Sequence, residues 1–231
     1  MKPCLIFVGL FLSSFFADAN IVINGTRVIY PEKNKDVIVQ LVNDGSDPSL
    51  VQAWIDDGDM NSTPETANVP FLLSPPVVKV AGNNGQQLRI QKIGAALPGD
   101  RESVFYLNVL DIPPTPDNLQ GVNTLQLAIK SRIKLFYRPA ALMSSASAMP
   151  DLIELQATEA GFKVINKSPY FFTLVNIDQK GKKNLLVDSV MVAPFSSQVA
   201  AAKVTVKRNV PYTLLYVDDL GAYKSKAITA R

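Results

Sequence analysis

Leu97-Pro-Gly-Asp-Arg-Glu-Ser-Val-Phe-Tyr-Leu-Asn-Val-Leu-Asp-Ile-Pro113 and Ser131-Arg-Ile-Lys-Leu-Phe-Tyr-Arg-Pro139 are the two stretches that decide the fold of this chain. Both are rich in β-branched, leucine and aromatic residues, which favour strands, and both end at a proline. Similar short apolar runs, separated by clusters of Gly, Pro, Asn and Asp, occur along the rest of the chain. This spacing is typical of an all-β sandwich.

The amino terminus has the features of a signal peptide over residues 1–19. Lys2 precedes an apolar stretch from Leu5 to Phe16, and residues 17–19 (Ala-Asp-Ala) fit a small-x-small cleavage site. The apolar stretch has about 12 residues, whereas a membrane-spanning helix needs about 20, so we expect export rather than a retained anchor. Cleavage would remove Cys4, the only cysteine, and would leave a mature protein without disulfides.

The composition excludes several classes of catalytic chemistry. The chain has 23 Lys and Arg, 20 Asp and Glu, a formal net charge of +3, and no histidine. A Ser-His-Asp triad and a histidine zinc site are therefore excluded, as is a thiolate site in the mature chain. The charge is too small to suggest the concentrated basic stripe of a nucleic-acid-binding domain. Carboxylate and lysine chemistry remain possible for catalysis, but no cluster of such residues in the sequence suggests a site.

The mature chain, about 210 residues long, is sufficient for two domains. We expect an N-terminal immunoglobulin-like domain over residues 20–139, a linker over 140–150, and a C-terminal β-sandwich over 151–231. Trp54, the only tryptophan, is expected on the third strand, in the core of the first sandwich. The expected strands are Ile21–Ile29, Val37–Val42, Leu50–Ile55, Val77–Val80, Gln87–Ile93, Ser103–Leu110 and Thr124–Tyr137, then Leu152–Gln156, Phe162–Asn166, Tyr170–Ile177, Leu185–Val187, Gln198–Val206, Tyr212–Val217 and Tyr223–Ile228.

The expected strand Thr124–Tyr137 is unusually long, since strands typically have five or six residues. Leu125, Leu127 and Ile129 alternate with polar or small residues and therefore share one face. One interpretation is an ordinary half-buried strand that covers its own core. The other is that the strand extends beyond its neighbours and offers unpaired backbone groups to a second chain.

The two opening stretches, together with Thr26-Arg27-Val-Ile-Tyr-Pro31, resemble the periplasmic chaperones that assemble bacterial pili. The resemblance covers almost all of the first domain and implies two immunoglobulin-like domains with a cleft between them. It implies that the chaperone completes an unfinished pilin by lending it a strand, with Leu125, Leu127 and Ile129 filling the groove of the pilin. Such strand addition is a recognised mode of peptide binding.

The resemblance also implies that Arg27 and Lys134 bind the C-terminal carboxylate of the pilin in the cleft. A buried carboxylate needs charge-assisted donors, which Arg and Lys provide. Taken singly, either residue is compatible with an ordinary solvated charge. Arg132 is a rival in the same stretch, and only the resemblance favours Lys134. Alternation places Lys134 on the face opposite the three groove-filling residues, so we expect the cleft and that surface on different sides of the strand.

Three further residues, Glu102, Arg138 and Asp219, align with an ion network that joins the two domains in the family. Asp219 is followed by Leu220 where the family more often has an aromatic residue, and Asp218 is an alternative partner. Asp219 is equally compatible with a turn carboxylate beside Gly221. The network would fix the angle of the cleft, because a buried ion pair adds uncertain net stability.

The short, proline-containing loop between Leu110 and Thr124 and the absence of a cysteine pair resemble the short-loop branch of the family, which serves rod-like pili. The resemblance implies a periplasmic chaperone that uses neither cofactor nor ATP, binds pilus or fimbrial subunits and delivers them to an outer-membrane usher. It implies neither nucleic-acid binding nor membrane insertion. The free protein is expected to be able to self-associate through its exposed edge.

Parts of the sequence are also compatible with two other functions. A secreted immunoglobulin-like adhesion or binding module would suit the three possible glycosylation triplets that begin at Asn24, Asn61 and Asn166. An exported hydrolase that uses carboxylates would need a cluster such as Asp56, Asp57 and Asp59, but Asp-Asp-Gly-Asp is more typical of a turn.

Overall fold

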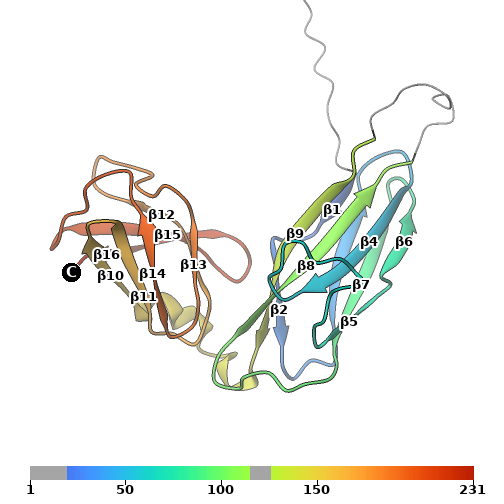
Figure 1. The fold of residues 1–231 in the computed structure, drawn as a ribbon, viewed down its shortest axis with the longest axis horizontal. Helices are drawn as coiled ribbons and strands as arrows, with labels where there is room; N and C mark the ends of the chain where they lie inside the picture. Colours follow the sequence, from blue (N-terminus) through green and yellow to red (C-terminus); the bar gives the residue numbers. More distant parts are fainter. Residues whose placement is uncertain (1–19, 115–125) are drawn as a thin grey trace, which may run out of the picture.

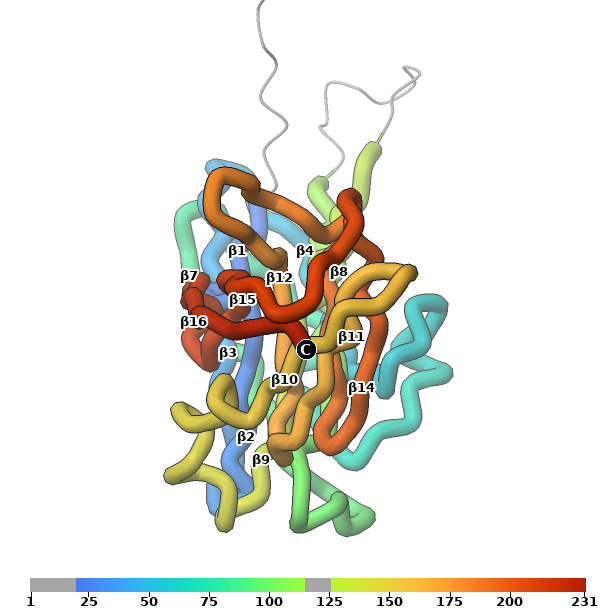
Figure 2. The backbone as a smooth tube through the Cα atoms, turned by 90° about the vertical axis from the view of Figure 1, so that its left-hand side faces the viewer, coloured from blue at the N-terminus to red at the C-terminus, as the bar shows by residue number. Residues whose placement is uncertain are grey.

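The computed structural model describes residues 20–114 and 126–231. Two β-sandwich domains lie side by side and are joined at one end by a short connection (Figure 1). Figure 2 shows the molecule turned so that the C-terminal domain is in front. The predicted all-β, two-domain fold is confirmed.

The N-terminal domain packs two sheets face to face. One sheet has the strand order β1-β3-β7-β5 and the other has the order β2-β9-β8-β4-β6. Between them lies a single apolar core in which residues such as Tyr30, Leu107 and Leu135 are fully buried. The strands are β1 (Ile21–Ile23), β2 (Arg27–Pro31), β3 (Val37–Asn43), β4 (Ser49–Asp56), β5 (Phe71–Ser74), β6 (Val77–Val80), β7 (Gly85–Lys92), β8 (Ser103–Ile112) and β9 (Ile129–Arg138).

The C-terminal domain is also built from two sheets, with strand orders β10-β11-β14 and β13-β12-β15-β16. Its separate core contains fully buried Phe162, Phe172 and Leu174. Its strands are β10 (Ile153–Thr158), β11 (Gly161–Asn166), β12 (Phe172–Asp178), β13 (Val190–Val192), β14 (Ser196–Ala201), β15 (Pro211–Val217) and β16 (Tyr223–Thr229). No helix among residues 20–114 and 126–231 is long and apolar enough to cross a membrane.

The connection between the domains consists of two 3₁₀ turns, η2 (Ala140–Leu142) and η3 (Ala146–Leu152). It is not the loose linker that its small residues suggest. Leu142 and Met149 pack against the core of the C-terminal domain. The hydroxyl of Tyr170 donates a hydrogen bond to the carbonyl oxygen of Leu142 at 2.5 Å. The amide of Ala140 donates to Glu32 Oε2 at 2.8 Å, which ties the connection to the first domain as well.

Several strand predictions were wrong in their extent. The expected strand Ile21–Ile29 is divided by a turn in which Gly25 has a φ of 117°, and this turn carries the chain from one sheet to the other. Strands β5 and β13 were not predicted. Leu185–Val187 is not a strand, since only Leu186 forms an isolated bridge, to Ala202.

The prediction that Trp54 fills the core was also wrong. Trp54 is buried, but its neighbours Ala53 and Ile55 on β4 are the residues that face the core. Because side chains alternate along a strand, Trp54 lies on the opposite face of the five-stranded sheet. There Lys130 Nζ lies 5.9 Å from the centre of its ring.

Candidate functional site

One edge of β9 is paired only over half of its length. β8 runs antiparallel to β9 from Ile129 to Tyr137. On the other side, β2 runs parallel to β9 but pairs only from Lys134 to Arg138. Among the described residues, no strand pairs with the outer edge of Ile129–Ile133. This segment therefore presents backbone groups that are available to another strand.

The long strand was predicted to begin at Thr124, but β9 begins at Ile129. Leu125 and the loop from 115 to 124 lie outside the described residues. Leu127 is described, precedes the strand and is 63% exposed. Ile129 is the first residue of the strand and is 41% exposed.

The two faces of β9 have different surroundings. Leu135 and Tyr137 are buried in the core, and Ile133 packs against its margin. Ile129 has the same parity and continues this apolar face beyond the core. Lys134 belongs to the opposite face, as alternation predicted.

Arg27 and Lys134 are direct neighbours, because β2 and β9 pair at these two residues. Arg27 Nε is buried and has no hydrogen-bond partner within residues 20–114 and 126–231, and its guanidinium lies 5.7 Å from the centre of the Phe136 ring. Among the described residues, no ion pair involves Arg27 or Lys134. Burial lowers the pKa of Lys134, and the positive charge of Arg27 lowers it further. Two adjacent, partly buried cations without a counter-ion are suited to bind a carboxylate.

Arg132, the rival of Lys134, is already paired. Its Nη2 lies 2.5 Å from Asp56 Oδ1 and its Nε lies 3.1 Å from Asp56 Oδ2. Asp56 is 2% exposed and also accepts hydrogen bonds from Asn108 Nδ2 at 2.6 Å and from the amide of Gly58 at 2.7 Å. Asp56 was predicted to be part of a turn, and only the residues after it form one. Asp56 follows Trp54 by two residues and therefore shares its face of β4. This spacing is the sequence feature that could have placed Asp56 on the strand.

The three predicted network residues lie together at the junction of the two domains. Arg138 Nε donates to Glu102 Oε1 at 2.7 Å, and its two terminal nitrogens donate to Asp219 at 2.6 and 2.8 Å. Glu102 Oε2 accepts the amide of Phe171 at 2.8 Å. Burial opposes the charge of Arg138, but the hydrogen bonds and negative charges of Asp219 and Glu102 outweigh it, so the pKa of Arg138 is raised. Asp218 instead accepts the amides of Leu220 and Ala222 within its own turn.

A cleft of about 530 Å³ lies between the domains, beside Arg27 and Lys134. Strand β12 of the second domain contributes Thr173, whose buried hydroxyl has no hydrogen-bond partner in the part of the chain that the structure describes. Gly221, in the turn between β15 and β16, lies against Thr26, and a Cβ atom at Gly221 would meet the Thr26 hydroxyl at 2.2 Å. The glycine thus lets this turn come close to the first domain.

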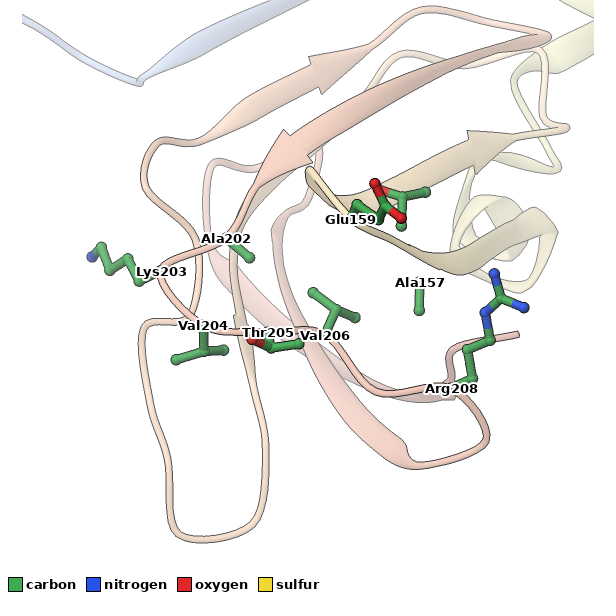
Figure 3. Close-up of a pocket in the computed structure, with 9 residues that line it drawn as sticks. Ala157, Glu159, Ala202, Lys203, Val204, Thr205, Val206 and Arg208 are labelled. Carbon is green, nitrogen blue, oxygen red and sulfur yellow. The ribbon is translucent and has the colours of Figure 1, made fainter.

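A second hollow, of about 420 Å³, lies on the C-terminal domain (Figure 3). Its lining comes from the end of β10, the turn that follows, and the segment after β14, and includes Glu159, Lys203 and Arg208. It contains none of the predicted site residues. Among the described residues, no group of three or more acidic or cysteine side chains is placed to hold a metal ion.

Fold and site together define a two-domain β-sandwich protein with a basic cleft beside an unpaired strand edge. Residues 20–143 match the family described as pili and flagellar-assembly chaperone, PapD N-terminal domain. Residues 148–228 match the family described as pili assembly chaperone PapD, C-terminal domain. The chain therefore belongs to the pilus-assembly chaperones, and the predicted family is confirmed.

Individual relatives agree with this assignment. The probable fimbrial chaperone YehC of Escherichia coli K12 is 43% identical over 92% of this chain and 87% of its own length. The chaperone protein HifB of Haemophilus influenzae is 44% identical over 96% of this chain and 93% of its own length. The crystal structure of the CupB2 chaperone of Pseudomonas aeruginosa matches with a TM-score of 0.78 at 31% identity, covering 91% of this chain and 100% of that chain. These relatives do not favour the alternative of a secreted adhesion module.

Proposed function

We propose that this protein is a periplasmic chaperone for pilus or fimbrial subunits. It binds and folds a subunit, caps it by donor-strand complementation, and delivers it to an outer-membrane usher. The observation that carries this proposal is the unpaired edge of Ile129–Ile133 next to two cations, Arg27 and Lys134, that have no ion pair among the described residues. An incomplete subunit offers the two matching features, a missing strand and a free terminal carboxylate.

The bound subunit would extend the five-stranded sheet. Its backbone would pair with the free edge of β9, and Leu125, Leu127 and Ile129 would fill its open groove. Burying a large apolar side chain contributes about 1.5–3 kcal/mol, so these residues would supply a large share of the affinity. The exposure of Leu127 and Ile129 supports this role, because an apolar side chain left in water gains most from being covered.

The carboxylate at the end of the subunit would bind Arg27 and Lys134 in the cleft. The network of Glu102, Arg138 and Asp219 would hold the two domains at the angle that this cleft needs. The contacts of Arg138 with both domains support this role.

The remaining assignments follow from the same function. Residues 1–19 are a signal peptide that is removed on export to the periplasm, and residues 20–139, 140–150 and 151–231 are the first domain, the linker and the second domain. The protein is not an enzyme, belongs to the short-loop branch, and self-associates through the free edge of β9 when no subunit is bound.

The proposal is tested by co-expressing the chaperone with a pilus subunit and purifying the complex from the periplasm. Arg27→Ala and Lys134→Ala should leave the chaperone folded, by circular dichroism, but abolish recovery of soluble complex. Lys79→Ala, at an exposed lysine of β6 in the same sheet, is the matched control and should yield complex normally. Normal yields from both cleft variants would show that the two cations do not anchor the subunit.

A further inference from the structure

Three cations project from one face of β9 at intervals of two residues: Lys130, Arg132 and Lys134. Residues two apart along a strand are separated by about 7 Å. A subunit that slides by two residues keeps each of its side chains on the same face, so the alternation of apolar side chains does not prevent the slip. Its terminal carboxylate would then reach Arg132 instead of Lys134. The chaperone needs another feature to exclude this register.

Asp56 is placed to exclude the register that is shifted by two residues, because it binds Arg132. Both of its carboxylate oxygens are bound to the Arg132 guanidinium, at 2.5 and 3.1 Å, which is a two-point ion pair. Hydrogen bonds from Asn108 to Oδ2 and from the amide of Gly58 to Oδ1 also hold the carboxylate in place. The Asp56 side chain is 2% exposed and that of Arg132 is 18% exposed, so solvent weakens this pair only slightly.

The face of the Arg132 guanidinium is also covered, because its central carbon lies 3.7 Å from the centre of the Tyr106 ring. Lys130 donates to the carbonyl oxygen of Met60 at 3.3 Å and lies over Trp54. Of the three cations, only Lys134 has neither an ion pair nor a hydrogen bond among the described residues, and Arg27 lies beside it. The cations that stay available are therefore Lys134, at one end of the row, and Arg27 on the neighbouring strand.

We propose that Asp56 is a positioning residue that sets the register of the bound subunit, by occupying Arg132 and leaving Arg27 and Lys134 as the carboxylate site. This inference rests on the proposed function, because it needs a subunit carboxylate in the cleft. Asp56 itself does not contact the subunit and acts through Arg132.

The test compares two synthetic peptides with alternating valine and serine residues, one with a free C-terminal carboxylate and one with a C-terminal amide. In the otherwise unchanged chaperone, Lys134→Ala should weaken binding of the free-acid peptide about tenfold, as expected for the loss of a charge-assisted hydrogen bond. Binding of the amide peptide should change little.

The same substitution is then made in the Asp56→Asn protein, in which Arg132 is released. Lys134→Ala should now weaken binding of the free acid by less than about threefold, because Arg132 takes over the carboxylate. Adding Arg132→Gln should restore the full tenfold loss. Asp57→Asn, at the exposed neighbouring position, is the matched control and should behave like the unchanged chaperone. A tenfold loss in the Asp56→Asn background would overturn the inference.

A second measurement needs no substitution. In an NMR titration of the arginine side chains, the free-acid peptide should shift the resonance of Arg27 Nε and leave that of Arg132 unchanged. A shift at Arg132 that the amide peptide does not produce would show that Asp56 leaves it accessible. If the unchanged chaperone does not distinguish the two peptides, the carboxylate anchor itself is wrong and both proposals are overturned.

Discussion

The two halves of β9 belong to one continuous strand but have different neighbours. In the second half, from Lys134 to Arg138, β8 lies on one side and β2 on the other, and the last four residues are buried. In the first half, from Ile129 to Ile133, β8 is the only paired strand among the described residues, and Ile129 is 41% exposed. One half builds the domain, whereas the other half is available to a partner. Substitutions of the four buried residues of the second half should therefore affect stability, whereas those in the first half should affect binding.

The largest loss of stability is expected from Arg138→Ala, at the end of the paired half. This change leaves the carboxylate of Glu102 buried without its cation, which typically costs about 3–5 kcal/mol. The free energy of unfolding is measured by urea denaturation. Arg101→Ala, which removes an exposed ion pair with Asp100, is the control and should lower the free energy of unfolding much less. Equal losses would contradict the structural importance of the buried network.

Leu135→Ala tests the core face of the paired half. Leu135 is fully buried between the sheets, and such truncations cost about 2–5 kcal/mol because they leave a cavity. The same denaturation measurement applies. A cost below about 1 kcal/mol would mean that this half of β9 does not support the core.

A smaller and pH-dependent effect is expected from Asp56→Asn, beside the free half. Burial opposes the charge of Asp56, but the hydrogen bonds from Arg132 and Asn108 outweigh it, so the pKa of Asp56 is lowered. A carboxyl group whose pKa is lower in the folded state stabilises the fold above its unfolded pKa, about 4, and loses this contribution as the pH falls through its folded pKa. Asp56→Asn should therefore lose stability at neutral pH and decline less steeply below about pH 4. Parallel curves for the two proteins would contradict the ion pair.

The smallest effect on stability is expected from Ile129→Ala, in the free half. An exposed side chain outside the core should change the free energy of unfolding by no more than about 0.5 kcal/mol. Binding of a subunit should nevertheless weaken by about tenfold or more, because a buried apolar contact is lost. Isothermal titration with a subunit measures this. A variant that loses stability but binds normally would reverse the assignment of the two halves.

The sequence predicted the fold class and most of the strands, because alternating apolar runs and turn residues are local signals. It did not predict that Ile21–Ile29 is divided between two sheets. Asn24-Gly25 is a turn signal, but apolar residues continue on both sides of it, and the prediction treated the whole run as one strand. The short strand β5 was missed because it contains no β-branched residue and lies between Pro70 and Pro75, whereas the equally short β6 was predicted from its three valines.

Within the candidate site, the sequence alone did not separate Lys134 from Arg132. The difference between them depends on Asp56, which is 76 residues away from Arg132 in the chain. Asp218 and Asp219 present the same difficulty. They are adjacent and chemically equal, and only the folded turn directs one carboxylate to backbone amides and the other to Arg138.

Trp54 lies on the outer face of the five-stranded sheet, one strand away from β9, and Lys130 of the free half of β9 lies over its ring. As the only tryptophan of the chain, it is a built-in fluorophore at this position. Selective excitation of the indole would report changes around the free edge without any attached dye. Subunit capture could thus be followed in real time with the native protein.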